Sequence, residues 1–263
     1  MTTHIDVSSL TVHYGERGRA VVDGLNLVIE AGTFMAILGP SGCGKSTLLN
    51  SIAGFVFPTS GSVTFDGAPV TGPGPERGVV FQRDVLFPWA SVGANIGFAL
   101  RAAGVPRRLR REKIDALVHA VGLAPDVVGK RPHQLSGGMR QRVGIARALA
   151  NNPRVLLMDE PFGALDALTR QQMQDLVVEL WNRSQTTIIF VTHDVDEAIR
   201  IASSIVVMNE SGAIADHITN PLPRPRPVSR LAEFDDYAAL RRRLHDLLRA
   251  TQPASTITMG DHL

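Results

Sequence analysis

Residues 39–47 of this chain have the sequence Gly39-Pro40-Ser41-Gly42-Cys43-Gly44-Lys45-Ser46-Thr47. This sequence matches the phosphate-binding pattern G-x-x-x-x-G-K-[ST] at every fixed position. The apolar run 33–38 before it predicts a buried strand, and Leu48, Leu49 and Ile52 after it have helical spacing. A strand, a glycine-rich loop and a helix are the context that the motif requires. The alternative, a glycine-rich turn with a chance lysine, leaves that context unexplained.

The residue types in this loop are those that phosphate binding needs. The three glycines permit backbone conformations that direct successive N–H groups at phosphates from a helix N-terminus. Lys45 adds a point charge for the β- and γ-phosphates, Ser46 offers its hydroxyl to Mg²⁺, and Thr47 can reach the α-phosphate. We therefore predict that the whole loop binds a nucleotide through Gly39, Pro40, Ser41, Gly42, Cys43, Gly44, Lys45, Ser46 and Thr47.

The composition narrows the classes of protein to consider. The chain has 263 residues, enough for one large domain or for a core with an inserted subdomain. Its 27 basic and 25 acidic residues are scattered and give a net charge of only +2, which argues against nucleic acid as the main partner. The single cysteine, Cys43, excludes an internal disulfide or a cysteine-rich zinc site and predicts a reducing, cytoplasmic compartment.

Two further features bear on membranes. Residues 1–6 lack the basic and apolar segments of a secretory signal. No stretch approaches the roughly 18 to 20 uninterrupted apolar residues of a spanning helix. If the protein works at a membrane, we expect another chain to hold it there.

The first part of the chain predicts an antiparallel β unit. Apolar and polar residues alternate over 4–29, around turns that lead into the strand before the loop. Tyr14 lies just before a glycine in this unit, where its ring could stack on a purine base. An ordinary core tyrosine is the alternative.

A polar side chain ends the next predicted core strand. Residues 78–82 form a short apolar strand that finishes in Gln82, at the edge where open α/β sheets bind ligands. Gln82 could therefore reach Mg²⁺ or an attacking water. A solvated amide at a strand end is the alternative.

Helical periodicity follows this strand. The apolar residues of 114–121 have helical spacing, and we predict an inserted helical subdomain over about residues 84–150. The subdomain opens on the bulky apolar stretch 85–89. That stretch suits either a groove for a partner's helix or the subdomain's own core.

Ser136, Gly137 and Gly138 precede another predicted helix. Exposed N–H groups at a helix N-terminus make a second anion site. Because one phosphate pocket does not need two such cradles, we expect this one to serve the nucleotide of another subunit.

Two later strands end in residues suited to catalysis. The apolar run 155–158 is followed by Asp159, which would hold Mg²⁺ directly or through water, and by Glu160, which would polarise an attacking water as general base. The strand 187–192 is followed by His193, which could hydrogen-bond to the γ-phosphate. A helix cap is the alternative for the two carboxylates and also for the histidine.

The C-terminal part changes character. Residues 205–208 form the last predicted core strand, and the proline-rich stretch 220–227 predicts an extended linker. Apolar residues in 237–248 predict an amphipathic helix, and 251–263 a loose tail. We therefore place the main domain at 4–215 and treat the remainder as linker, helix and tail.

In this order and spacing, the motifs resemble those of the ATP-binding subunit of ATP-binding cassette (ABC) transporters, over roughly residues 4–215. The resemblance implies an α/β fold with a P-loop NTPase (RecA-like) core, an N-terminal antiparallel β subdomain and an inserted helical subdomain. The positions that match are Tyr14 for the base-stacking aromatic, Gln82 for the Q-loop, Ser136 to Gly138 for the signature, Asp159 and Glu160 for the Walker B pair, Asp166 for the D-loop and His193 for the switch histidine.

The resemblance also implies roles for these residues, with ATP and Mg²⁺ as cofactors. It implies catalytic roles for Lys45, Gln82, Glu160 and His193, a metal site at Ser46, Gln82 and Asp159, and nucleotide contacts from Tyr14, the loop, Ser136, Gly137, Gly138 and Asp166. Met139 departs from the family pattern, in which glutamine is commonest. We expect activity to survive because the serine and glycines before it are intact.

A finer likeness lies in residues 81–95 and 159–170, which resemble the importer subfamily that serves nitrate, aliphatic sulfonates and taurine. Neighbouring members of that subfamily carry pyrimidine-type precursors, which remain the alternative solute. The likeness implies a second copy of the ATPase subunit as partner. It also implies transmembrane permease subunits and, indirectly, a solute-binding protein. The expected location is the cytoplasmic face of the cell membrane.

Two other classes fit less well. A small GTPase or nucleotide kinase does not need the Ser136 to Gly138 cradle, and no lysine here occurs in an Asn-Lys-x-Asp guanine motif. A soluble ABC ATPase of DNA repair or translation usually has long coiled coils or two cassettes in one chain, and this sequence has neither.

Overall fold

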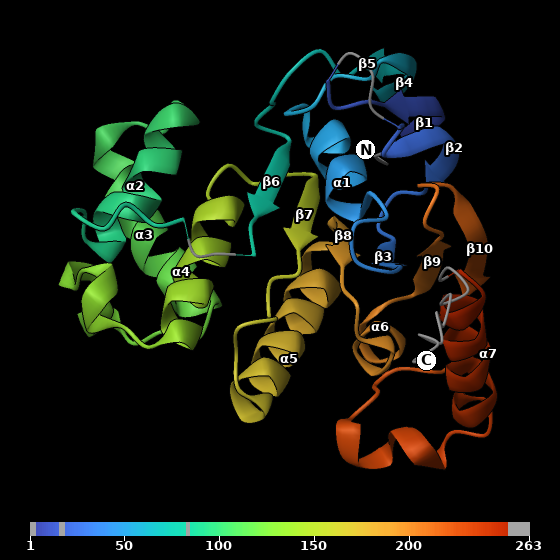
Figure 1. Ribbon diagram of the computed structural model, residues 1–263. Helices are drawn as coiled ribbons and strands as arrows, with labels where there is room; N and C mark the ends of the chain where they lie inside the picture. Colours follow the sequence, from blue (N-terminus) through green and yellow to red (C-terminus); the bar gives the residue numbers. More distant parts are fainter. Residues whose placement is uncertain (1–3, 16–18, 83–84, 252–263) are drawn as a thin grey trace, which may run out of the picture.

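The computed structural model describes residues 4–15, 19–82 and 85–251 (Figure 1). The predicted start of the helical insert at residue 84 and the predicted tail beyond residue 251 lie outside the described residues. The strands are β1 Ile5–Val12, β2 Val22–Ile29, β3 Phe34–Leu38, β4 Ser60–Phe65, β5 Ala68–Pro69, β6 Arg77–Val80, β7 Val155–Asp159, β8 Thr187–Val191, β9 Ser204–Met208 and β10 Ile214–Thr219. The α-helices are α1 Lys45–Ala53, α2 Val92–Ala102, α3 Arg107–Ala120, α4 Gly137–Leu149, α5 Ala167–Ser184, α6 Val195–Ile201 and α7 Tyr237–Ala250, and short 3₁₀ turns cover Pro125–Gly129, Pro132–Gln134 and Val228–Glu233.

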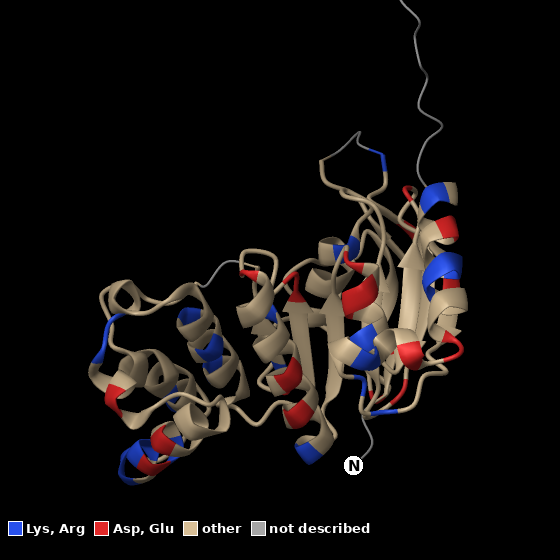
Figure 2. Ribbon diagram, turned by 90° about the horizontal axis from the view of Figure 1, so that it is seen from below, with Lys and Arg blue, Asp and Glu red and all other residues tan. Residues whose placement is uncertain are grey.

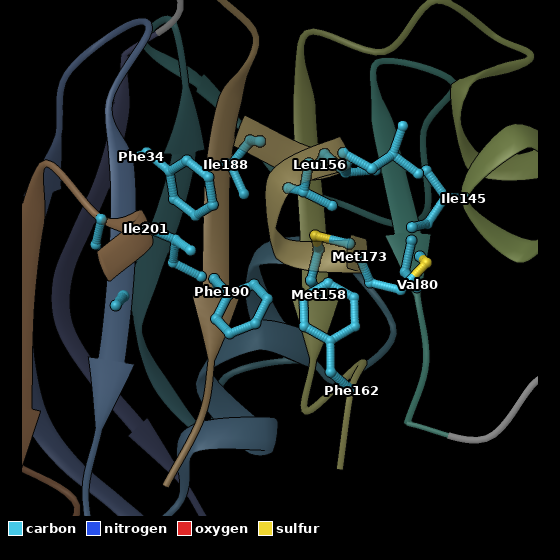
Figure 3. Packing of buried hydrophobic residues seen from close by; sticks show 14 of the residues in the cluster. Phe34, Val80, Ile145, Leu156, Met158, Phe162, Met173, Ile188, Phe190 and Ile201 are labelled. Atoms are coloured by element: carbon cyan, nitrogen blue, oxygen red, sulfur yellow. The ribbon is translucent and has the colours of Figure 1, made fainter. Parts of the chain in front are cut away.

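A six-stranded sheet of order β10-β9-β3-β8-β7-β6 forms the centre, and all its neighbours are parallel except the β10–β9 pair. Its inner strands are apolar at almost every position because helices or a second sheet cover both faces. Alternate side chains point to opposite faces. Ile188 and Phe190 of β8 join Leu156 and Met158 of β7 on one face (Figure 3), and Ile189 belongs to the core on the other.

That other face is covered by α1 and by an antiparallel sheet of order β2-β1-β4-β5. Leu48, Leu49 and Ile52 of α1 pack with Ile5 of β1 and Ile29 of β2 in a single core. The predicted antiparallel β unit is therefore present, and it holds the first helix against the central sheet.

The helical insert extends beyond β6, where α2, α3 and α4 pack on one another (Figure 1). The apolar stretch 85–89 is partly core and partly surface, and its use by a partner stays a prediction. Leu86 is buried in the core, whereas Val85 and Trp89 are 50% and 73% exposed. Basic and acidic residues are interspersed over the described elements (Figure 2), as the sequence predicts. In the described part of the chain, no helix combines the length and apolar character needed to cross a membrane.

The structure corrects two expectations for the C-terminal part. Residues 205–208 are not the last core strand, because β10 follows and pairs with β9 in antiparallel fashion. The predicted domain boundary at 215 therefore falls inside β10. The sequence does not predict this edge strand because Asp216 and His217 interrupt its apolar pattern, and only Ile218 of the strand is buried.

The predicted linker 220–227 is extended but not free. Asn220, Leu222 and Arg226 are buried, and the Arg226 guanidinium donates to the carbonyl oxygen of Ile199, near the end of α6. Burial, with the charge of a nearby arginine, lowers the pKa of Arg226 to about 10. Prolines exclude this stretch from helices and sheet ladders, but they do not prevent it from packing.

The final helix also belongs to the main folded unit. Leu240 and Leu244 of α7 are buried in the same core as the central sheet, and α7 packs against α6 and β9. Its amphipathic character, predicted from the sequence, thus reflects one face turned to the protein's own core.

Candidate active site

The phosphate-binding loop joins the end of β3 to the start of α1. Gly44, the N-cap residue of α1, has a left-handed backbone with φ of 97°. A Cβ there would lie 2.5 Å from the carbonyl oxygen of Val21, so the position requires glycine. The Lys45 ammonium donates to the carbonyl oxygens of Gly39 and Pro40 at 2.9 and 2.8 Å. Its charge and the helix N-terminus therefore lie together, where both favour an anion.

Ser46 and Asp159 meet beside this loop. The Ser46 hydroxyl donates to Oδ1 of Asp159 at 2.9 Å, from the first turn of α1 to the last residue of β7. Burial raises the pKa of the Asp159 carboxyl, and the hydrogen bond from Ser46 partly opposes that effect. A hydroxyl and a carboxylate in contact are oxygen donors of the kind that Mg²⁺ prefers.

Glu160 follows in a left-handed backbone conformation, with φ of 41°. Such a conformation costs a non-glycine residue about 1–3 kcal/mol and persists only where neighbouring structure enforces it. Here β8 does so. The Glu160 N–H donates to the carbonyl oxygen of Val191 at 3.0 Å, and the buried ring of Phe162 packs on Phe190 with centroids 5.4 Å apart (Figure 3).

Gln82 and His193 converge on the Glu160 carboxylate. Nε2 of Gln82 lies 3.5 Å and Nδ1 of His193 lies 3.3 Å from the same Oε2 of Glu160. The three residues meet because β6, β7 and β8 are adjacent parallel strands, whose C-terminal ends share one edge. The helix-cap alternatives are wrong: Asp166 caps α5 and Asp194 caps α6.

Tyr14 lies on the rim of the loop. Its hydroxyl is 3.4 Å from Oγ1 of Thr47, and the residue is 57% exposed. It is therefore not an ordinary core tyrosine. An exposed ring beside the nucleotide-binding loop is available for stacking, which stays a prediction.

Ser136, Gly138 and Asp166 form a second group. Ser136 caps α4 by accepting from the Met139 N–H at 3.3 Å. Asp166 caps α5 by accepting from the Thr169 N–H at 2.9 Å, and that hydrogen bond lowers the pKa of Asp166. A Cβ at Gly138 would lie 2.5 Å from the Thr169 side chain, so glycine allows α4 and α5 to approach closely here.

The helix that follows Ser136 lies on the other face of the central sheet from α1. Buried residues of α4 belong to the core on one face of the central sheet, and those of α1 to the core on the other. In Figure 1 the two helices lie on opposite sides of β7. The structure thus brings together the phosphate-binding loop, Tyr14, Gln82, Asp159, Glu160 and His193, but not Ser136, Gly137, Gly138 or Asp166.

The sequence motifs predict no role for Glu197. It is buried on α6 and accepts hydrogen bonds from Thr192 and Gln174. The spacing Asp194-x-x-Glu197 resembles a helix capping box, and this could have drawn attention to it. Nothing in the spacing reveals that the side chain turns toward α5.

A family model described as ABC transporter matches residues 22–163, which include the loop, Asp159 and Glu160. The chain belongs to the ABC transporter family. An ABC relative, the taurine import ATP-binding protein TauB of Chromobacterium violaceum, is 49% identical over 216 residues, or 82% of each chain. A Brucella abortus protein named as an ATP-binding protein is 46% identical over 254 residues, or 96% of each chain.

A solved ABC cassette has the same fold. The dimeric post-hydrolysis structure of MJ0796, bound to ADP and Pi, has a TM-score of 0.73 at 31% identity and covers 83% of this chain and 100% of its own. The predicted α/β fold is confirmed. As a member of the ABC family, the chain binds and hydrolyses ATP.

Proposed function

We propose that this chain is the ATPase subunit of an ABC importer that moves a sulfonate of the taurine type through a separate membrane permease. The observation that carries the proposal is the meeting of Gln82, Glu160 and His193 beside Ser46 and Asp159, next to a phosphate-binding loop. Import and a sulfonate are supported by the TauB relative, which is named for taurine import. Nitrate and pyrimidine-type precursors are the alternative solutes.

ATP would bind with its phosphates at the loop and Lys45 and with its base against Tyr14. Ser46 and Asp159, with the side-chain oxygen of Gln82, offer oxygen donors that fit Mg²⁺. When bound there, Mg²⁺ supplies positive charge that offsets the negative charge of the transferring phosphoryl group.

Glu160 would orient the attacking water and accept its proton. The enforced backbone at this residue fixes where the carboxylate can reach, and contacts from Gln82 and His193 hold the same Oε2. The imidazole would also donate to the γ-phosphate. Positioning and electrostatics, rather than covalent chemistry, would thus provide most of the rate.

A second copy of the chain would complete each site. Ser136 and Asp166 cap α4 and α5, whose buried residues pack on the face of the central sheet opposite to α1 and its loop. In a head-to-tail pair Ser136, Gly137, Gly138 and Asp166 would face the γ-phosphate held by the partner. The dimeric state of the MJ0796 cassette supports this arrangement.

The permease would dock at the apolar groove between the insert and the central sheet. This groove has a volume of about 410 Å³ and is lined by Phe55, Phe81, Val85, Phe87 and Phe98, among others. Val85 and Phe98 are each about half exposed. An aromatic groove of this kind suits a short helix of another protein, and it would place the chain at the cytoplasmic face of the membrane.

The decisive experiment isolates the tagged chain from gently solubilised membranes and measures ATP turnover of the complex with candidate solute-binding proteins. We expect a multi-spanning subunit to co-purify and taurine or another sulfonate to raise turnover. Stimulation only by nitrate or by a pyrimidine precursor would reassign the solute. A chain that remains alone and soluble would favour the non-transport ABC ATPases.

A further inference from the structure

A buried polar network lies directly behind His193. The carboxylate of Glu197, on α6, accepts a hydrogen bond from the Thr192 hydroxyl at the end of β8. Its other oxygen accepts from Nε2 of Gln174, on α5, at 2.8 Å. Arg200 in turn donates to the oxygen of Gln174. Three elements are therefore joined through the carboxylate of Glu197, a residue that is only 8% exposed.

This network fixes the turn on both sides of His193. Thr192 immediately precedes the histidine, and its hydroxyl also accepts from the Asp194 N–H at 3.1 Å. The Asp194 carboxylate accepts from the Glu197 N–H at 3.1 Å. Both neighbours of His193 thus depend on Glu197, one through its side chain and one through its backbone.

The turn has two further contacts: the Arg170 guanidinium lies 4.0 Å from the Asp194 carboxylate, and the Thr192 N–H donates to the carbonyl oxygen of Ile37 at 3.2 Å. A cavity of about 40 Å³ lies on the side of the active site, and its lining includes Glu160, His193, Asp194 and Glu197. His193 itself is an exposed side chain, 65% accessible, and touches Glu160 across this space. Because the exposed imidazole borders this cavity, its position depends on the hydrogen bonds behind the turn together with its contact to Glu160.

We propose that Glu197 is a positioning residue for ATP hydrolysis, which holds the His193 turn against α5 so that the imidazole stays within reach of Glu160. The inference rests on the proposed function, in which His193 and Glu160 act together. Since Asp166 caps α5, the contact with Gln174 also links this turn to the helix whose N-cap would face a second copy.

Two substitutions of Glu197 can separate the effect of its hydrogen bonds from the effect of its volume. In a Glu197→Gln variant, the Thr192 hydroxyl can turn from donor to acceptor while Gln174 still donates to the remaining oxygen. Glu197→Met keeps much of the volume but removes both acceptors. Positioning therefore predicts opposite outcomes for two substitutions of similar size.

The test measures steady-state ATP turnover and ATP affinity of the full-length chain. We expect Glu197→Met to lower kcat by about 10- to 100-fold, with ATP affinity within about 3-fold of wild type, because misplacement of a catalytic group affects chemistry more than binding. Glu197→Gln should keep kcat within about 3-fold of wild type. Wild-type turnover in Glu197→Met, or equal loss in both variants, would overturn the proposal.

A matched control lies at the other end of α6. Asn220 is also buried and donates to the carbonyl oxygens of Ile199 and Ala202, so Asn220→Ala tests for general loosening of the helix. We expect it to lower thermal stability without lowering kcat. A kcat loss there as large as in Glu197→Met would also overturn the proposal.

Two further variants separate this inference from the proposed function. If Glu197→Met does not fold, Thr192→Val, which removes one hydroxyl, should show the same fall of kcat at unchanged ATP affinity, and wild-type kcat would contradict the inference. His193→Ala should lose turnover. Full turnover in His193→Ala would overturn both the proposed role of His193 and the inference. If His193→Ala loses turnover while Glu197→Met remains fully active, only the inference is overturned.

Discussion

At the scale of single residues, Glu160 shows how backbone conformation and chemistry are combined. Its left-handed φ is enforced by β8, and its carboxylate is held by side chains from two neighbouring strand ends. We expect Glu160→Gln to lower kcat by about 10²- to 10⁴-fold, the usual contribution of a general base, while ATP still binds. Phosphate release and nucleotide binding measure the two effects. Glu179→Gln, at a solvent-exposed ion pair on α5, is the control; full turnover in Glu160→Gln would contradict the assignment.

Asp159 provides a second prediction, on pH. Burial raises the pKa of its carboxyl in the folded state, so the neutral form is favoured by folding and the wild type loses stability as the pH rises through that pKa. Asp159→Asn removes the charge and can still accept from Ser46. Denaturation should show the variant to be more stable than wild type at neutral pH, with the gap narrowing as the pH falls. ATP turnover should fall by more than about 10-fold, since an oxygen ligand for Mg²⁺ is weakened. A gap that is constant with pH would contradict this account.

At the scale of elements, α7 is the clearest case of a helix whose importance depends on packing. Leu244 is fully buried in the main core, although proline-rich chain separates it from the central sheet. Leu244→Ala should therefore cost about 2–5 kcal/mol in the free energy of unfolding, as for other core leucines. Chemical denaturation should show one cooperative transition. Leu109→Ala, at a 38% exposed position on α3, should change stability by no more than about 0.5 kcal/mol. Separate melting of α7 would show that it is not part of this unit.

At the scale of the whole molecule, the separation of the two residue groups makes a prediction about pairs of chains. Lys45→Ala should inactivate the site that contains the variant chain's own loop. Ser136→Arg should inactivate the other site, in which the variant chain's signature faces the partner's loop. A mixture of the two inactive variants should regain about a quarter of wild-type turnover, because half of random pairs are mixed and each has one intact site of two. Turnover assays on mixed and unmixed samples measure this. A mixture that stays inactive, with mixed pairs demonstrated, would contradict the head-to-tail arrangement.

The site could be predicted from sequence wherever a residue follows a strongly apolar strand. Gln82, Asp159 and His193 stand at such strand ends, and parallel strands bring their ends to one edge. Tyr14 could not be assigned to surface or core in this way, because one aromatic residue in an alternating segment fits both. Glu197 could not be predicted because its partners lie on two other elements, 5 and 23 residues away along the chain.

The sequence by itself determined the α/β core, the phosphate-binding loop and the identity of the residues at the strand ends. These follow from local periodicity, from glycine spacing and from the rule that parallel strands are buried on both faces. Only the tertiary structure decided that β10 joins the sheet, that residues 220–227 and α7 pack on the core, and that the Ser136 group lies apart from the loop. Edge strands, extended segments and helix contacts depend on partners distant in the chain, and local sequence patterns carry no record of such partners.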